Sequence, residues 1–198
     1  AGAPGGVRPI AGRRPVTPKR LQIIALPGVP EVAPGDDVAR IVATALAAEG
    51  ETLASGDVIV IAQKIVSKAE GRYVELDSVT PSARARALAA EVDKDPRLVE
   101  VILSESAEVL RARKGLLIVV HRLGFVVANA GVDASNLALG DGRNRVLLLP
   151  EDPDGTCARL RAAFKETFGL EAGVIVCDSV GRAWRSGTVG IALGAAGL

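Results

Sequence analysis

The sequence predicts an α+β fold with a mixed β-sheet and flanking helices. Short runs of β-branched and apolar residues, typical of strands, occur in both halves of the chain. Segments with apolar residues at helical spacing lie between these runs. Strands and helices do not alternate strictly, and no Gly-x-Gly-x-x-Gly motif follows a predicted strand, which disfavours a dinucleotide-binding fold.

The first twenty residues differ in composition from the rest of the chain. Residues 1–20 are rich in Gly, Pro and Arg and contain no acidic residue, which predicts a flexible leader. Residues 21–198 are predicted to form the structured domain. Its first strand is predicted at the apolar run 21–26, which Pro27 and Gly28 bring to an end.

The next segments carry one helix signal and two strand signals. Asp37 is a typical N-cap for a helix whose apolar residues begin at Val38, and Gly50 ends that helix. The run 57–68 opens as a buried strand and becomes polar towards its end. The stretch 73–76 is predicted to be a short strand.

The remaining elements follow from the same signals. Helices are predicted at 81–92 and 95–111, because each carries Pro near its start and apolar residues at helical spacing. Residues 115–131 predict a hairpin with its turn at Leu123 and Gly124. The further predictions are a strand at 145–150, a helix at 152–169, a strand at 173–179 and a last strand within 188–198.

Charge and hydropathy exclude several classes of partner. The formal net charge is +1, so the chain offers no strong field for nucleic acid or a membrane surface. No apolar run reaches the roughly 18 residues that a membrane span needs. The printed chain stops inside an apolar, glycine-rich segment, so we expect the domain 21–198 to lack its C-terminal tail.

Few residues suit zinc or nucleophilic chemistry. Cys157 and Cys177 lie on separate predicted elements, which indicates free thiols in a reducing, cytoplasmic compartment. His121 is the only histidine and lies in an apolar strand, so it is predicted to be a hydrogen-bonded structural residue. Glu105 and Glu108 fall on a predicted helix and are expected to face solvent.

Two aspartates follow apolar runs and stand beside glycines and small polar residues. They are Asp133 in "GVDASN" and Asp178 in "CDSVGR". Carboxylates of this kind bind Mg²⁺ or Mn²⁺, which fill their other positions with water and phosphate oxygens. The alternative interpretation is that both side chains accept backbone hydrogen bonds in turns. Spacing alone leaves both roles open.

Basic residues supply two further candidate sites. Lys64 and Lys68, near the end of the predicted strand 57–68, could bind nucleotide phosphates, although the Walker A spacing is absent. The alternative for them is a solvated sheet edge. Arg182 and Arg185 could bind a carboxylate or phosphate in bidentate fashion. The alternative for that segment is a long polar turn anchored by its tryptophan.

Several segments together resemble a known family. The stretches "LPGVPEVAPGDD", "GDVIVIAQKIVSKAEGR", "DPRLVEVILSES", "ANAGVDASN", "LLPEDPD" and "GVIVCDSVGRAWRSGTVG" are similar, in this order, to the coenzyme F420 γ-glutamyl ligases. The resemblance runs from about residue 21 to the end of the chain. It implies an intertwined homodimer with a mixed α/β fold.

The resemblance also implies an activity. The family uses GTP, two divalent cations (Mn²⁺ or Mg²⁺) and K⁺ to add L-glutamate to the phospholactate carboxyl group of the deazaflavin precursor F420-0. Further glutamates are then added through γ-linkages. We expect the γ-phosphoryl group of GTP to activate the carboxylate as an acyl phosphate, which the glutamate amine then attacks.

Site residues are carried over by position within the matching motifs. Asp133 matches a metal aspartate of the family, and Asp178 with Ser179 matches a second pair of metal ligands. Arg182 or Arg185 could hold the carboxylate of glutamate or of the acidic precursor. The positions that match nucleotide-binding residues are Leu26, Pro27, Gly28, Val29, Gln63, Lys64, Lys68 and Asn136.

One departure keeps other functions open. A segment with an Asp-Arg-Gly motif, which follows the glycine-rich strand in the family, is absent from the printed sequence. The chain could therefore be a catalytically silent GTP- and metal-binding module. An amide ligase for another carboxylate on the same scaffold is the second alternative.

Overall fold

The computed structural model describes residues 21–133, 144–181 and 186–198. The predicted leader 1–20 lies outside these residues, as do Asn136, Arg182 and Arg185. The helices are α1 (Val38–Ala48), α2 (Gln63–Ala69), α3 (Ala83–Val92), α4 (Pro96–Ser104) and α5 (Pro153–Phe168), with 3₁₀ turns η1 (Leu76–Ser78) and η2 (Asn129–Gly131). The strands are β1 (Val58–Ala62), β2 (Tyr73–Glu75), β3 (Ser106–Arg113), β4 (Leu116–His121), β5 (Val126–Ala128), β6 (Arg145–Leu147), β7 (Gly173–Gly181) and β8 (Thr188–Ala196).

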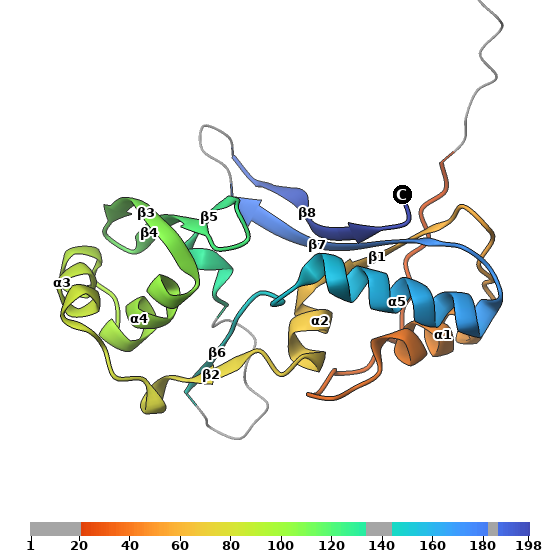
Figure 1. The fold of residues 1–198 in the computed structure, drawn as a ribbon, viewed down its shortest axis with the longest axis horizontal. Coiled ribbons are helices and arrows are strands. Elements are labelled where there is room, and N and C mark those ends of the chain that lie inside the picture. The colour runs from red at the N-terminus through yellow and green to blue at the C-terminus, as the bar shows by residue number, and fades with distance from the viewer. Residues whose placement is uncertain (1–20, 134–143, 182–185) are drawn as a thin grey trace, which may run out of the picture.

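These elements form two lobes joined by a ribbon (Figure 1). The first lobe contains a sheet in the order β1-β7-β8, and the second contains a sheet in the order β3-β4-β5. Strands β2 and β6 pair as a two-stranded ribbon between the lobes. Strand β7 runs parallel to β1 and antiparallel to β8, so the predicted α+β class with a mixed sheet is confirmed.

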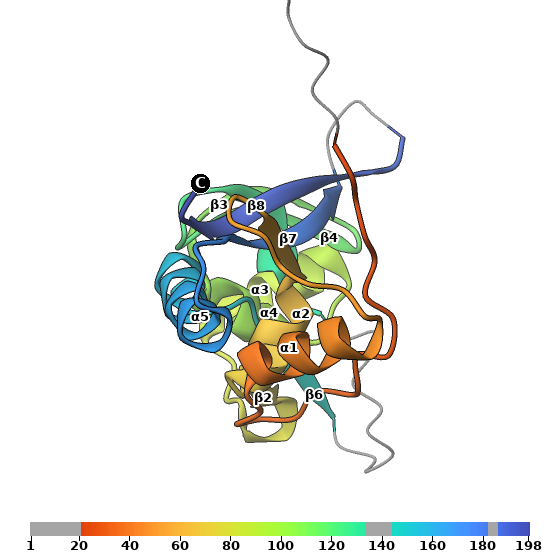
Figure 2. The same ribbon diagram turned by 90° about the vertical axis from the view of Figure 1, so that its right-hand side faces the viewer.

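Helices α1, α2 and α5 cover one face of the first sheet, as Figure 2 shows. Alternate residues of the strands point to that face, because side chains alternate across a strand. Ile59 and Ile61 are buried there, and Phe164 of α5 packs into the same core. Val58 and Val60 point away from the helices and are 46% and 59% exposed, so β1 is buried on one face only.

The second lobe has its own core. Helices α3 and α4 pack against β3 and β4, and Val92, Val99, Ile102, Leu117 and Val119 between them are fully buried. Aspartate caps begin α1 and α5, and the cap at Asp37 is the one that the sequence predicts. The Asp37 side chain accepts the N–H of Arg40 at the start of α1, and Asp152 accepts the N–H of Gly155 at the start of α5. The hairpin β4–β5 also turns where predicted.

Three predicted elements are wrong in whole or in part, and the first two are strands. Residues 21–26 form no strand in the described part of the chain, and Leu21 and Ile23 are exposed. An apolar run becomes a strand only where a partner supplies a hydrogen-bond ladder. The predicted strand 57–68 ends at Ala62, and α2 begins at once. Val66 on α2 is buried against the core, and that packing favours the helix.

The predicted helix 95–111 is also shorter than expected. It ends at Ser104, and the following residues form β3, which pairs with β4. Non-local pairing therefore overrides the helical spacing of the apolar residues. The prediction that Glu105 faces solvent is wrong, because its side chain is buried. Arg72 and Arg122 each donate a hydrogen bond to its Oε2 at 3.1 Å.

His121 is confirmed as a hydrogen-bonded structural residue. It is buried, and its Nδ1 accepts the N–H of Leu123 at 3.0 Å. Its ring also stacks on Phe125. Among the described residues, no helix combines the length and apolar character that crossing a bilayer would require.

Candidate active site

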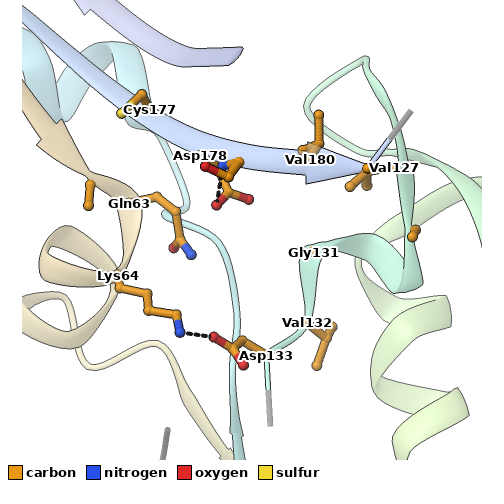
Figure 3. A pocket seen from close by; sticks show the side chains of 13 residues that line it. Gln63, Lys64, Val127, Gly131, Val132, Asp133, Cys177, Asp178 and Val180 are labelled. Atoms are coloured by element: carbon orange, nitrogen blue, oxygen red, sulfur yellow. Dashed lines mark hydrogen bonds and ion pairs between the residues drawn. The ribbon is translucent and has the colours of Figure 1, made fainter. Parts of the chain in front are cut away.

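A pocket of about 500 Å³ lies where the two lobes meet (Figure 3). Its polar lining residues are Gln63, Lys64, Asp133, Asp178 and Ser179. The pocket thus gathers both predicted metal aspartates, which are 45 residues apart in sequence. We refer to it below as the aspartate pocket.

Strand β7 carries Asp178 into this pocket. Val174, Val176 and Asp178 point to the same face of the strand, because side chains alternate. The two valines are fully buried in the core of the first lobe. Neighbouring β1 ends at Ala62, opposite Cys177. Asp178 therefore lies just beyond the end of the adjacent strand, where the core gives way to the pocket.

A tight turn places Asp133 opposite. Residues Asn129, Ala130 and Gly131 all have positive φ values, of 49°, 54° and 66°. This turn leads to Asp133, whose backbone N–H and carbonyl both bond to Leu147 of β6 at 2.9 Å. The two bonds fix the backbone of Asp133 to the ribbon between the lobes.

Helix α2 supplies the cationic part of the wall. Lys64 Nζ forms an ion pair with the Asp133 carboxylate at 2.5 Å. Gln63 begins the helix, and its side chain extends into the pocket (Figure 3). Both residues lie on a helix and not on the strand that the sequence predicts.

The electrostatics of the pocket favour an added positive charge. Burial raises the pKa of the Asp178 carboxyl group, and the nearby Asp133 raises it further. The N–H of Ser179, the charge of Lys64 and hydrogen bonding from Gln63 lower the same pKa and offset part of this effect. Two carboxylates close enough to disfavour each other's ionisation form a site that a cation would stabilise.

The residues present fit a divalent cation that takes only part of its ligands from the protein and the others from water and substrate phosphate. The described residues contain no group of three or more His, Cys, Asp or Glu side chains placed to hold a metal. Mg²⁺ commonly uses one or two carboxylates and completes its shell with water and phosphate oxygens. Asp133 and Asp178 suit that mode of binding, and Ser179, next to Asp178 on β7, also lines the pocket.

Other predicted site residues lie away from the aspartate pocket or outside the described residues. Lys68 is not part of the pocket lining and pairs with Glu31. The segment 26–29 is also absent from that lining, although Leu26 packs against the core of the first lobe. Asn136, Arg182 and Arg185 fall among the residues that the structure does not describe, so their roles stay predictions.

No signal in the sequence identifies the apolar wall of the pocket. Val127, Val132 and Val180 line the side that faces the second lobe (Figure 3). Val127 and Val180 lie in strands, where valine is typically a core residue, and nothing in the sequence context of the three valines marks them as pocket-lining. Their position follows from the way the two lobes meet.

Comparison with known proteins identifies the family of the chain. The family model described as F420-0:Gamma-glutamyl ligase matches residues 28–198. A relative from Methanothermobacter thermautotrophicus is 44% identical over 178 residues, which are 90% of this chain and 69% of the relative. A relative from Methanopyrus kandleri is 44% identical over 178 residues, 90% of this chain and 67% of the relative. A Haloarcula marismortui relative is 42% identical over 184 residues, 90% of this chain and 68% of the relative.

Each of these relatives is named Coenzyme F420:L-glutamate ligase. The family match spans most of the chain, and identities above 40% extend over nine-tenths of it. The chain therefore belongs to the F420-0:gamma-glutamyl ligase family.

Proposed function

We propose that the chain is a GTP-dependent ligase that joins L-glutamate to the carboxyl group of F420-0 and then adds further glutamates through γ-linkages. Membership of the ligase family supports the reaction class. The observation that carries the proposal is the meeting of Asp133, Asp178 and Lys64 in one pocket. This arrangement suits a triphosphate that brings divalent cations with it.

The pocket residues have distinct roles in this proposal. Asp133, Asp178 and Ser179 would hold two divalent cations, Mg²⁺ or Mn²⁺, and K⁺ would accompany them. These ions would neutralise charge on the triphosphate. Lys64 can turn from Asp133 to a phosphate oxygen, because its side chain is 36% exposed. Gln63, at the start of α2, lowers the pKa of Asp178 and so favours its ionised form.

The chemistry proceeds in two displacements. An oxygen of the F420-0 carboxylate attacks the γ-phosphorus of GTP, and GDP leaves with the electrons of the broken P–O bond. The amine of glutamate then attacks the carbonyl carbon of the acyl phosphate, loses a proton and displaces inorganic phosphate. Activation is needed because oxide is a poor leaving group from a carboxylate. Positioning and charge neutralisation are what phosphoryl transfer asks of the protein.

We also propose that the protein acts as a homodimer. The face of the first sheet opposite its helices exposes Val58 and Val60, and Leu21, Ile23 and Ile24 are exposed as well. Apolar surface of this kind is typical of an interface. Light scattering should give the mass of two chains, and Val60→Glu should reduce it to one. A wild-type chain that is monomeric at micromolar concentration contradicts this proposal.

The free thiols of Cys157 and Cys177 fit a reducing compartment, and we place the enzyme in the cytoplasm.

The activity is tested by incubating the chain with F420-0, L-glutamate, GTP and Mn²⁺ and analysing the products by mass spectrometry. We expect a product that is heavier than F420-0 by one glutamate residue. One GDP should be released for each amide bond formed. Binding of GTP without release of GDP would identify a silent nucleotide-binding module. Product formation with another carboxylate, but none with F420-0, would identify a different amide ligase.

A further inference from the structure

The sheet β3-β4-β5 of the second lobe has helices α3 and α4 packed on one of its faces (Figure 1). Directly opposed residues of an antiparallel strand pair point to the same face. Val109 and Val119 are opposed and pack in the core beneath the two helices, so they mark the inner face. The opposite face, which we call the outer face, carries the apolar side chains of Leu116, Ile118 and Val120 from β4 and of Val126 and Ala128 from β5.

The outer face leaves apolar side chains open to solvent. Val126 is 57% exposed and Leu116 is 37% exposed, although both lie in strands. A group of exposed apolar side chains with a polar border commonly marks a site that binds a ligand or another protein.

Two arginines on β3 border these apolar residues. Arg111 and Arg113 are each opposed to an outward-facing residue of β4, so both point outward. A register shift between Val109 and Arg111 produces this orientation, because strict alternation would place Arg111 on the inner face with Val109. Such bulges redirect side chains and occur often beside active sites. Glu108 also faces outward, at the other end of β3, so the basic end of the outer face is at the two arginines.

The outer face continues into the aspartate pocket. Ala128 belongs to the outer face and also lines that pocket. Ala128 is opposed to Ile118, and Ile118 is opposed to Arg111, so the three residues form a row across the sheet. Neighbouring strands are about 4.8 Å apart, which places the backbone of Arg111 about 10 Å from that of Ala128. A ligand that extends out of the pocket past Ala128 therefore meets the apolar side chains and then the arginines.

We propose that the outer face binds the deazaflavin end of the acceptor F420-0, while the reacting carboxyl group of the acceptor lies in the aspartate pocket. This inference rests on the proposed function. The ring and the carboxylate are at opposite ends of the acceptor, with the phosphate between them, so the ring lies outside the pocket during the reaction. The flat ring suits the apolar side chains, and the planar guanidinium group of Arg111 suits the phosphate. Charge complementarity therefore favours this acidic ligand.

Binding of F420-0 can be measured without turnover, because the deazaflavin ring is fluorescent. The wild type and Arg111→Glu are titrated with F420-0 in the presence of GDP and Mn²⁺, which cannot supply a γ-phosphoryl group. We expect about tenfold weaker F420-0 binding in the variant, because a charged donor is replaced by a group of the same sign as the ligand. The affinity for GDP with Mn²⁺, measured by calorimetry, should not change. An unchanged F420-0 affinity overturns the proposal, as does an equal loss of affinity for GDP.

Arg84→Glu provides a matched control. Arg84 is an exposed arginine of the same lobe, but it lies on α3, which packs against the inner face of the sheet. The substitution makes the same change in charge as Arg111→Glu, so it should leave F420-0 affinity as in the wild type. An equal loss in both variants would reflect the net charge of the lobe and overturns the proposal.

Val126→Glu distinguishes the acceptor from a second copy of the chain as the occupant of the outer face. The substitution removes an exposed apolar contact and adds a negative charge, so it should weaken F420-0 binding. Light scattering should give the same mass as for the wild type. A lower mass for the variant would show that the outer face lies between copies of the chain, and it overturns the proposal.

The inference and the proposed function fail in different ways. A wild type that binds F420-0 and loses this binding in Arg111→Glu, but forms no amide bond, refutes the proposed function and leaves the binding surface in place. A wild type that ligates glutamate, with a KM for F420-0 that is unchanged in Arg111→Glu, overturns the inference alone.

Discussion

Gly131→Ala should damage both the fold and the site, because this glycine has two structural constraints. Its φ of +66° is in the left-handed region, where an alanine costs about 1–2 kcal/mol. An added Cβ would also lie 2.8 Å from Leu149 Cδ1 and 2.9 Å from Leu149 Cγ. Leu149 is 1% exposed and its carbonyl accepts the Arg72 Nε–H at 2.9 Å, so it has little room to move.

Overpacking of this kind typically costs about 1–3 kcal/mol more, so we expect a loss of about 2–5 kcal/mol in the free energy of unfolding. Gly115→Ala is the matched control. Its φ is +78°, but a Cβ there meets nothing within 4 Å, so it should show only the backbone cost of about 1–2 kcal/mol. Urea denaturation of both variants measures the difference.

Activity provides the second measurement. Gly131 lies two residues before Asp133, so a shift of this turn moves a predicted metal ligand. At a temperature where both variants are folded, Gly131→Ala should lose most of its glutamate ligation and Gly115→Ala should retain it. The reasoning is refuted if Gly131→Ala is no less stable than Gly115→Ala, since the clash with Leu149 would then be absent.

Three further predictions follow from single side chains. Asp133→Ala should abolish glutamate ligation while circular dichroism shows a folded protein, and normal turnover with GTP, Mn²⁺ and F420-0 would exclude its metal role. Lys68→Ala should mainly weaken GTP binding, so an unchanged affinity by calorimetry would count against a phosphate contact. Glu105→Gln should lower the free energy of unfolding by about 1–3 kcal/mol at pH 7, because Arg72 and Arg122 lose a charged acceptor. Burial opposes ionisation of Glu105, but His121, Arg122 and Arg72 together hold its pKa below the ordinary 4.5. The carboxylate therefore stabilises the fold above pH 4.5 and this contribution is lost as the pH falls through the lowered pKa, so the deficit of Glu105→Gln should shrink there. An equal deficit at pH 7 and in acid would contradict this assignment.

Local signals predicted the elements that depend on local interactions. Helix α1 begins at the aspartate cap that the sequence predicts, and the β4–β5 hairpin turns at its glycine. The failures concern residues whose structure depends on distant partners. Residues after Ser104 become β3 only because β4 pairs with them, and 21–26 forms no strand among the described residues. The pattern of a single sequence does not say which segments pair as strands and which lack a partner strand.

The site residues also divide into those that the sequence identified and those that only the structure shows. The resemblance to the ligase family identified Asp133, Asp178, Lys64 and Gln63, and the structure brings all four to one pocket. Sequence reasoning did not identify the apolar wall of the pocket. Val127, Val132 and Val180 come together there only because the two lobes meet, which no local pattern in the sequence reports.

The carboxylates of the aspartate pocket repel each other, so the surrounding strands must hold them in place. Asp178 is fixed by β7 within the sheet of the first lobe, and Asp133 is fixed by two backbone bonds to β6 in the ribbon. Each raises the electrostatic cost of ionising the other, and Lys64 offsets only part of it. The two carboxylates therefore stay together because separate strands hold their backbones. A site held in this way needs little rearrangement to receive the cation and the triphosphate that we propose for it, which is the condition under which fixed charges contribute most to catalysis.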